Sequence, residues 1–569
     1  MEKILGIDLG TSTSEIAYIN DDGNVELIPN HFGDYITPSV VHIKEDGKVI
    51  VGIEAKEQLI LNPESTFMEV KRLMGQDVKL TCHNKNYSPI EITSYILGYL
   101  MECAKTYLGE DINRAVLTVP AYFTDAQRKD TIKAGELCGI KVERIINEPT
   151  AASLDYGIMN MDECKNIMIF DFGGGTLDVT VMELFEGVID VKSSCGNNSL
   201  GGKDFDQAII NYVVNKVNSK HKTDISKDLR NMVRIKQVAE ECKIALSSKD
   251  KFYIDLPFLA QAKGKPVGFS ETLTRDFFEG LISEKVKSTS KQVKTALSDA
   301  NLAASELDLV LLVGGTTKIP LVTNFLKNEL GLNPESLIDP DLGVVRGAAI
   351  QAGIINDEFK DSQKEIIITD ICPYSLSTGV LESTVFGLKK LFCDILIKRN
   401  TTIPTSTQKV YVTSSDYQEK VEIDTYQGES ELPDENILLN KFFLTGIPRA
   451  KAGKEKIKVA FSYDINGILN VQGEIISTGK STCVEIDTKS TSTDLDLDTW
   501  KDAPNAKKYR AVIRKTDKYL NTDEEIDHDI FMLKSKVDEL KRGIILDWDL
   551  NILDNIKDDI IQILDDLDV

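Results

Sequence analysis

The sequence predicts a multidomain protein with an α/β domain first, an all-β domain second and a short helical segment last. Up to about residue 358, apolar runs typical of strands, such as "LVLLVGG", alternate with helical stretches such as "TDAQRKDTIKAGELCG". From about residue 371 to 490, apolar and polar residues alternate with the period of two that favours strands. Beyond about residue 495, apolar residues recur at helical spacing. A chain of 569 residues is long enough for these separate cores.

Composition argues against several classes of partner. Acidic residues exceed basic ones by 24, so the summed charge repels nucleic acid and anionic membrane surfaces, and we expect neither as a partner. The nine cysteines are scattered without metal-binding or redox spacing, which indicates free thiols in a reducing compartment. No apolar run approaches the roughly 20 residues of a membrane span. We therefore expect a cytoplasmic protein.

A motif near the N-terminus recurs in the middle of the α/β region. "KILGIDLGTSTSEIAYI" and "NIMIFDFGGGTLDVTVM" both contain a buried strand, an aspartate, a glycine-rich turn with hydroxyl groups and a second strand. Turns with few side chains let backbone N–H groups close on phosphate oxygens. Asp8 and Asp171 at the strand ends can hold a hydrated magnesium ion. One such turn could be only a flexible connection, but its repetition with aspartate in register predicts two facing hairpins that grip a nucleotide.

Four segments in order resemble the signatures of one family. "GIDLGTSTS", "IINEPTAASLDYG", "IFDFGGGTLDVTV" and "LVLLVGGTTKIPLV" look like those of the DnaK-type molecular chaperones, the heat shock protein 70 family, and the match spans nearly all of residues 1–480. "LIPNHFGDYITPSVV", "ITDICPYSL" and "FSYDINGIL" are most similar to the HscC-type branch. The resemblance implies a duplicated, actin-like ATPase domain at 1–358, an interdomain linker at 359–370, a β-sandwich that binds peptide at 371–490 and a short α-helical lid at 491–569.

The resemblance also implies an activity. The family hydrolyses ATP to ADP and phosphate and couples this to binding and release of extended apolar segments of unfolded proteins, notably under stress. The expected cofactors are ATP or ADP and Mg²⁺, with K⁺ as an optional further cation. Expected partners are unfolded client peptides and a J-domain co-chaperone, with a nucleotide exchange factor as an optional addition.

The resemblance also assigns the family's ATP-site roles to individual residues of this sequence. Lys71 would neutralise charge on the γ-phosphate and orient the attacking water. Glu148 would accept a hydrogen bond from that water or from the shell of the metal, and Asp171 and Thr176 complete the catalytic set. Asp8 and Asp171 would surround magnesium, largely through water. Without the resemblance, Lys71 would be a solvated side chain and Glu148 a helix-start carboxylate. The expected nucleotide-binding residues are Gly10, Thr11, Ser12, Thr13, Gly173, Gly174, Gly175, Thr176, Gly201, Gly202, Glu240, Lys243, Ser247, Gly314, Gly315, Lys318 and Asp341.

Some positions depart from the family pattern. Lys318 stands where the family usually has an arginine beside adenine, and Ile244 where a cation is common, so we expect weaker adenine binding. Asn198 replaces a common threonine, which excludes autophosphorylation at that position. The loop after Leu381 is longer than usual and borders the peptide site, which leaves client choice open.

Two further sets of residues follow from the resemblance. The peptide channel is expected to involve Leu376, Thr378, Tyr411, Val421, Ile423 and Ile468. Inward valines and isoleucines of any β-sandwich would look the same, so only the domain order favours this interpretation. A second set, the relay residues, is expected to transmit conformational change between the ATP site and the peptide site: Pro120, Arg128, Arg144, Ile366, Ile367, Ile368 and Asp370.

Two other classes of function remain open at this point. One is a small-molecule kinase of the actin superfamily, against which the C-terminal β domain argues. The other is a non-catalytic peptide-binding module that uses ATP only as a conformational key, against which intact Lys71, Glu148 and Asp171 argue.

Overall fold

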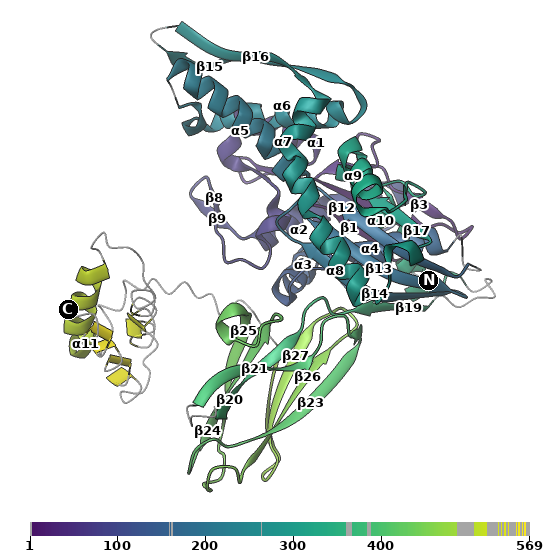
Figure 1. Ribbon diagram of the computed structural model, residues 1–569. Coiled ribbons are helices and arrows are strands. Elements are labelled where there is room, and N and C mark those ends of the chain that lie inside the picture. Colours follow the sequence, from purple (N-terminus) through teal and green to yellow (C-terminus); the bar gives the residue numbers. More distant parts are fainter. Residues whose placement is uncertain are drawn as a thin grey trace. The chain divides into compact units, whose positions relative to one another are not determined.

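The computed structural model describes residues 3–485, apart from 159, 161, 162, 223, 263, 264, 360–366 and 384–388, and then 506–520 and scattered positions between 533 and 564. The chain divides into two compact units, Met1–Thr488 and Lys489–Val569 (Figure 1). The lengthened loop after Leu381 and linker residue Ile366 lie outside the described residues.

The first sheet combines parallel strands with an antiparallel hairpin. Its main order is β11-β10-β1-β2-β3, and β4 (Thr37–Pro38) also pairs with β2. The bounds of the main strands are β1 (Leu5–Leu9), β2 (Thr13–Ile19), β3 (Val25–Leu27), β10 (Arg114–Val119) and β11 (Lys141–Asn147). β1 runs parallel to β10 and β10 parallel to β11, whereas β1 and β2 are antiparallel. β1 and β10 are buried along almost their whole length, as expected for strands covered on both faces.

The second sheet repeats this plan. Its order is β18-β17-β12-β13-β14-β19-β22. The bounds are β12 (Lys165–Phe172), β13 (Leu177–Phe185), β14 (Val188–Asn197), β17 (Leu309–Val313), β18 (Pro334–Glu335), β19 (Ile367–Ile371) and β22 (Thr402–Ile403). β12 is parallel to β17 and β17 to β18, whereas β12, β13 and β14 are antiparallel. The duplicated α/β domain that the resemblance implies is therefore confirmed.

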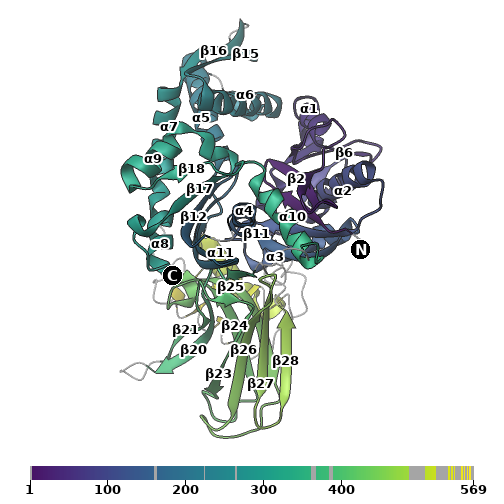
Figure 2. The ribbon, with the colours of Figure 1, turned by 90° about the vertical axis from the view of Figure 1, so that its right-hand side faces the viewer.

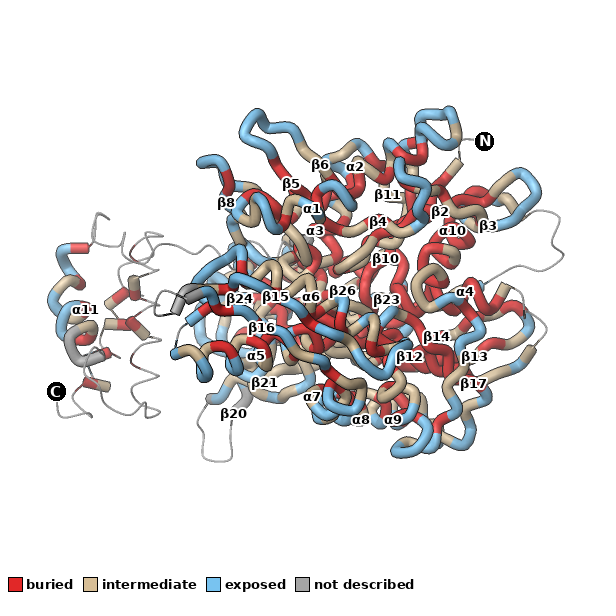
Figure 3. The backbone as a smooth tube through the Cα atoms, turned by 90° about the horizontal axis from the view of Figure 1, so that it is seen from above, coloured by how far each residue is buried: buried red, intermediate tan, exposed pale blue. Residues whose placement is uncertain are grey.

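Two buried helices join the sheets. α4 (Glu148–Gly157) packs on the second sheet and α10 (Gly343–Ile355) on the first, and the two helices pack against each other (Figure 2). At their crossing, a Cβ on Gly347 would stand 1.7 Å from the carbonyl oxygen of Ala151, so a side chain there would separate the helices. Both helices are almost wholly buried (Figure 3). This tight crossing fixes how the two duplicated halves meet.

Further helices and small sheets surround these layers. α2 (Pro89–Leu108) and α3 (Asp125–Leu137) pack together beside the first sheet, and α8 (Ser290–Asp299) packs on β13 and β14. Outer parts of the first half are β5 (Val40–Ile43), β6 (Val49–Val51), β7 (Thr66–Met68) and α1 (Ile53–Leu61). Outer parts of the second half are α5 (Gly202–His221), α6 (Leu229–Ser248), β15 (Lys251–Ala262), β16 (Lys265–Thr274), α7 (Arg275–Ser288) and α9 (Pro320–Leu330). α1 and α6 contact each other, so the outer parts of the two halves meet.

The all-β region is a sandwich of two four-stranded sheets, ordered β21-β20-β24-β25 and β23-β26-β27-β28. The strands are β20 (Leu376–Ser383), β21 (Lys389–Ile397), β23 (Thr405–Val412), β24 (Lys420–Gln427), β25 (Ile437–Thr445), β26 (Lys456–Tyr463), β27 (Leu469–Ile475) and β28 (Lys480–Glu485). Burial alternates along β26 and β27, as the period of two predicts. The inward residues, among them Leu444, Phe461 and Val471, form one core.

The second unit is helical where it is described. α11 (Ala506–Leu520) buries Tyr509 and Ile513. Leu533, Val537, Leu540 and Ile544 share a core with them, which confirms the helical spacing expected for these residues. Ile526, Ile530, Ile552 and Leu567, which follow the same spacing, lie outside the described residues. In the described part of the chain, no helix is both long and apolar enough to span a bilayer.

Candidate functional site

A narrow pocket of about 100 Å³ lies where the turns of the two repeated hairpins meet. One hairpin is β1 and β2, and the other is β12 and β13. Most predicted phosphate-site residues line the pocket: Asp8, residues 10–13, Lys71, Glu148, Asp171, residues 173–176, Gly314, Gly315 and Asp341. The pocket thus brings together residues from both halves of the duplicated domain.

The hairpin turns approach each other as closely as glycine allows. A Cβ on Gly174 would stand 2.5 Å from Ser12 Oγ, and one on Gly175 would stand 2.8 Å from Thr11 Oγ1. A Cβ on Gly201 would meet the backbone nitrogen of Gly175 at 2.5 Å. The two turns are therefore packed closely together, and the glycines of the second turn leave its backbone without side chains beside the pocket, as anion-binding turns require.

Lys71 is the cation that lines this pocket. It comes from the short helix Val70–Leu73 and donates a hydrogen bond to Glu148 Oε1 at 2.5 Å. Glu148 is the first residue of α4 and is followed by Pro149, so it is a helix-start carboxylate as well as a pocket residue. Both side chains are almost fully buried. The ion pair joins an outer part of the first half to the helix crossing.

Asp8 and Asp171 end the first strands of the two hairpins, as predicted. Thr118 Oγ1 donates a hydrogen bond to Asp8 Oδ1 at 2.6 Å. Burial, followed by the charge of Glu148, raises the pKa of Asp8 to about 6. The same two causes, joined by the charge of Asp178, raise the pKa of Asp171 well above its usual value. Buried carboxylates this close together require positive charge to remain ionised.

Two further acidic residues of this region were not predicted from the sequence. Glu15 and Asp178 lie seven residues after Asp8 and Asp171, and each is paired across its hairpin with that aspartate. Glu15 is 2% exposed and Asp178 fully buried. Burial raises the pKa of Asp178 to about 7 and that of Glu15 well above its usual value. The repeat that revealed the aspartates would have revealed both residues if it had been followed seven positions further.

The residues expected beside adenosine lie in two groups. Gly314 takes φ of +80°, and a Cβ there would stand 2.5 Å from the carbonyl oxygen of Phe172. Lys318 forms an ion pair with Asp341. Gly314 thus lets the loop after β17 approach the second hairpin, and the Lys318 ion pair joins this loop to the segment before α10.

The other group lies on α6 and makes polar contacts outside the phosphate pocket. Glu240 accepts hydrogen bonds from Lys203 and Lys56. Lys243 donates to Asp206 and to the carbonyl oxygen of Gly202, while Ser247 donates to the carbonyl oxygen of Lys243. The Lys243 contact places α6 beside the turn that contains Gly201 and Gly202.

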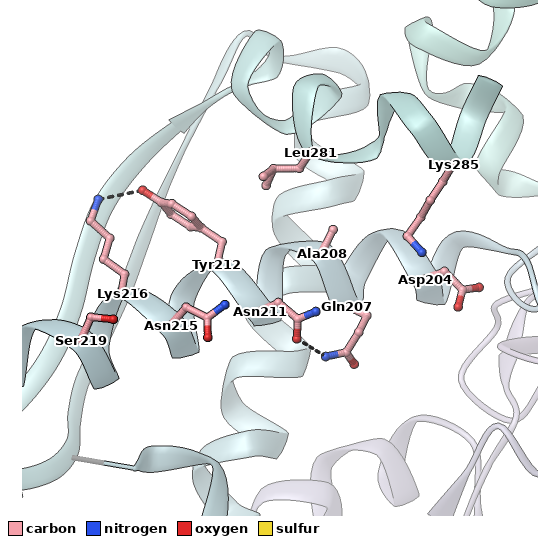
Figure 4. A pocket seen from close by; sticks show the side chains of 10 residues that line it. All are labelled: Asp204, Gln207, Ala208, Asn211, Tyr212, Asn215, Lys216, Ser219, Leu281 and Lys285. Atoms are coloured by element: carbon pink, nitrogen blue, oxygen red, sulfur yellow. Dashed lines mark hydrogen bonds between the residues drawn. The ribbon is translucent and has the colours of Figure 1, made fainter. Parts of the chain in front are cut away.

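A larger open cavity of about 710 Å³ lies elsewhere, along α5 and α7 (Figure 4). Most of the residues that line it have polar side chains, with Gln207, Asn211 and Asn215 on one face of α5 and Leu281 and Lys285 on α7. Neither hairpin turn contributes to it, so it is separate from the phosphate pocket.

Comparison with known proteins decides the family. The family model described as Hsp70 protein matches residues 4–560. The chain is 41% identical over 539 residues to chaperone protein DnaK of Thermosipho melanesiensis, covering 95% of this chain and 87% of the relative. It is 40% identical over 544 residues to chaperone protein DnaK of Thermotoga neapolitana, covering 95% and 88%. The DnaK of Thermosipho africanus is 42% identical over 479 residues, covering 84% and 79%.

The chain belongs to the Hsp70 family. It is an ATP-dependent molecular chaperone and an ATPase that binds ATP or ADP and unfolded client proteins. The small-molecule kinase and the non-catalytic module are not favoured, because the match extends through the ATPase domain and the sandwich together. The pocket between the hairpins is therefore the candidate ATP site of an Hsp70 chain.

The described end of the segment predicted to be the interdomain linker lies in a strand, β19. β19 pairs in parallel with β14, with Ile367 opposite Val188 and Ile368 opposite Ile189. Ile368 packs against the core of the duplicated domain, whereas Ile367 is 50% exposed. β19 therefore continues the second sheet, and Ile368 contributes more of its apolar burial than Ile367.

Two of the predicted relay residues, Arg128 and Asp370, are joined through Asn147 in a buried polar network beside this strand. Asn147 Nδ2 donates to both carboxylate oxygens of Asp370 at 2.8 Å, and its Oδ1 accepts from Arg128 at 2.6 Å. Arg144 donates to Gln351 on α10. Pro120 directly follows β10 and is buried. Asn147 immediately precedes Glu148, so the network connects the linker to the ATP site.

The sandwich contacts the ATPase domain through several polar groups. Asn466 Oδ1 accepts a hydrogen bond from the backbone N–H of Ile145, and Asp125 Oδ1 accepts one from Leu469. Burial raises the pKa of Asp125 to about 6. Arg399 Nη2 donates to Asp299 at 2.7 Å. Both sheets of the sandwich region thus lie close to the ATPase domain within this unit.

The predicted peptide residues do not form one cluster. Tyr411, Val421 and Ile423 lie at the strand ends beside the connection between β23 and β24, and they pack on the sandwich core. Leu376 pairs with Gln427 at the opposite end of β24. Ile468 lies in the turn between β26 and β27, at the end of its sheet remote from Tyr411. Thr378 lies between these ends and donates to the carbonyl oxygen of Asp424.

Proposed function

We propose that the hairpin pocket binds Mg²⁺ and ATP and that its own side chains carry out hydrolysis. The buried Lys71 and Glu148 pair, facing Asp8 and Asp171 between two glycine-rich turns, carries this assignment. ATP hydrolysis depends mainly on positioning and charge neutralisation, and these groups are placed for both.

The residues present fit a magnesium ion. Asp8 and Asp171 both line the pocket, and burial raises the pKa values of both carboxyl groups. Carboxylates and water are the ligands that Mg²⁺ prefers beside phosphates. Bound Mg²⁺ would neutralise phosphate charge, with K⁺ as an optional further cation.

Each remaining side chain has a distinct task. Lys71 places a positive charge beside the terminal phosphate and orients the attacking water. Glu148 holds Lys71 in place and accepts a hydrogen bond from that water. Thr176 and the backbone N–H groups of 173–175 hold the phosphates, as residues 10–13 do from the other side. Glu240, Lys243 and Ser247 on α6 take the nucleoside.

Coupling runs through the linker strand. With β19 paired to β14, Asp370 holds Asn147, which directly precedes Glu148. Loss of the strand pairing removes a partner of Asn147 and shifts the start of α4. This contact gives ATP and client peptide a shared two-state element, which allosteric coupling requires.

Several finer assignments belong to the same proposal. We assign the division into 1–358, 359–370, 371–490 and 491–569, the HscC-type branch suggested by "FSYDINGIL", and a cytoplasmic location. Client release is assisted by a J-domain co-chaperone and optionally by a nucleotide exchange factor. The client channel uses the sandwich end around Tyr411, Val421 and Ile423, since all three side chains pack on the sandwich core near the connection between β23 and β24.

A single-turnover experiment tests the proposal. Hydrolysis of a stoichiometric amount of ATP is followed with and without an extended apolar peptide. We expect measurable hydrolysis that requires Mg²⁺ and is accelerated by the peptide. Hydrolysis without acceleration would contradict the coupling, and binding without hydrolysis would contradict the roles of Lys71 and Glu148.

A further inference from the structure

Tyr374 of the sandwich region contacts the ATPase domain beside the second hairpin. It lies between β19 and β20, and its hydroxyl donates a hydrogen bond to the backbone carbonyl oxygen of Tyr122 at 2.9 Å. The two tyrosine rings also pack edge to face, with their centroids 4.5 Å apart. Burial and the charge of Asp178 raise the pKa of Tyr374, so its hydroxyl remains a hydrogen-bond donor at neutral pH.

The same carbonyl oxygen holds the side chain of Asn198. Asn198 Nδ2 donates to the carbonyl oxygen of Tyr122 at 2.8 Å, whereas Asn198 Oδ1 is buried without a hydrogen-bond partner. A carbonyl oxygen has two lone pairs, and here one accepts from Tyr374 and the other from Asn198. The orientation of the Asn198 amide therefore depends on an atom that it shares with Tyr374.

Asn198 begins the segment that supports the second phosphate turn. It directly follows β14 and leads into α5. The backbone N–H of Gly202 donates to the carbonyl oxygen of Gly173 at 3.0 Å, and that of Lys203 donates to the carbonyl oxygen of Gly174 at 2.9 Å. These bonds join the segment directly to the turn between β12 and β13. The position of Asn198 therefore bears on the backbone that faces the pocket.

This connection is separate from the one at the linker strand. Asp370 reaches Asn147 and the start of α4, whereas Tyr374 reaches the turn of the second hairpin. We propose that Tyr374 is a positioning residue of the ATP site, because its hydroxyl fixes Asn198 and thereby the turn that holds the phosphates. This inference rests on the proposed ATP site.

The proposal has a thermodynamic consequence. The hydroxyl of Tyr374 reaches Tyr122 only while the sandwich contacts the ATPase domain, so this contact favours ATP binding. Bound ATP then favours the contact by the same factor, because the coupling of two equilibria is reciprocal.

A double-mutant cycle on nucleotide affinity tests the proposal in the full-length protein, with a non-hydrolysable ATP analogue as the probe. Tyr374→Phe removes the hydroxyl and keeps the ring, and it should weaken analogue binding about fivefold through the loss of one hydrogen bond. Asn198→Ala should weaken binding to a similar degree. The double variant should bind no more weakly than either single variant, because both substitutions act on one contact.

Two control variants separate positioning from docking alone. Tyr463→Phe makes the same change at a buried tyrosine of the same interface, beside Arg128, and should leave the affinity unchanged. Arg399→Ala removes the ion pair with Asp299 and so weakens the sandwich contact without touching Tyr122. Its effect on affinity should multiply in full with that of Asn198→Ala.

Each outcome decides the proposal. Wild-type affinity in Tyr374→Phe overturns it, and so do effects of Tyr374→Phe and Asn198→Ala that multiply, since Tyr374 would then act only as a docking contact. Absence of analogue binding to the wild type would show that the ATP site itself is wrongly assigned, and the inference would fail with it. If thermal unfolding shows that Asn198→Ala does not fold, Asn198→Ser replaces it, and equal affinities of Tyr374→Phe and Tyr463→Phe still overturn the proposal.

Discussion

The ATP pocket and the peptide region are both built from buried strands and short turns, but packing accounts for their functional residues to different degrees. In the pocket, carboxyl groups and a lysine are buried where an apolar core would have been more stable. In the sandwich, Leu376 and Ile423 are fully buried core residues whose packing needs no ligand to explain it. Functional residues that are polar can therefore be told apart from residues that only stabilise the fold, whereas functional residues that are apolar cannot.

The largest effect on activity should come from a substitution in the ATP pocket, because Lys71 is the one positively charged side chain among the residues that line it. Lys71→Ala should lower single-turnover hydrolysis by about 100-fold or more, because the positive charge beside the terminal phosphate is lost. ATP affinity should change by less than about threefold, since the turns and the α6 residues still hold the nucleotide. The exposed Lys85→Ala is the matched control. Hydrolysis near the wild-type rate in Lys71→Ala would remove the lysine from the mechanism.

The connection between the regions should give the next largest effect. Ile368→Asp should abolish peptide-stimulated hydrolysis, because a carboxylate packed against the core disfavours strand pairing by several kcal/mol. Ile367→Asp should reduce stimulation only about two- to fivefold, since Ile367 is already half exposed. Hydrogen exchange at residues 367–369 should lose its ATP-dependent protection in the same order. Equal effects of the two variants would contradict the observed packing of β19.

A substitution in the sandwich should have the opposite effect, in which peptide binding changes but ATP hydrolysis does not. Val421→Phe should weaken peptide binding about tenfold in the ADP state by filling the space that a leucine-like client side chain would take. Basal ATP hydrolysis should change by less than about twofold. Val412→Phe, at a position that is 54% exposed on β23, provides the control. Wild-type peptide affinity measured by fluorescence anisotropy would place the channel elsewhere.

The smallest effect concerns pH and the contact between the regions. Asp125 accepts a hydrogen bond from Leu469, and burial raises its pKa to about 6, although the charge of Lys129 opposes this. In an undocked state, Asp125 would return to a pKa of about 3.9. The docked state then holds more protons between pH 4 and 6, so lowering the pH from 7.5 to 5.5 should favour docking about fourfold.

A fluorophore pair, one on the ATPase domain and one on the sandwich, would measure this docking. The informative quantity is the difference between the wild type and Asp125→Asn, because other buried carboxyl groups, such as Asp370, shift in the same direction. An unchanged pH dependence in Asp125→Asn would exclude this residue as the cause.

The sequence predicted the pocket better than the sandwich site for a physical reason. In two places of the chain, an aspartate interrupts an apolar strand just before a glycine-rich turn. Asp8 and Asp171 could therefore be recognised from the sequence. Glu15 and Asp178 were missed because each lies within the following strand, where a single acidic residue resembles ordinary alternation. The sequence did not predict that Tyr411 and Ile468 lie at opposite ends of their sheet, because the pairing register of the strands decides which end each residue reaches.

The place of β19 at the side of β14 also bears on self-association. β14 has β13 on one side, and in this arrangement β19 occupies the other, so the backbone of residues 188–190 is paired. A strand edge without a partner presents unpaired N–H and C=O groups that can template pairing with another chain. Each cycle that frees the linker would expose such an edge in a protein that handles other unfolded chains. The linker strand therefore also protects the sheet from unwanted strand addition for as long as it stays in place.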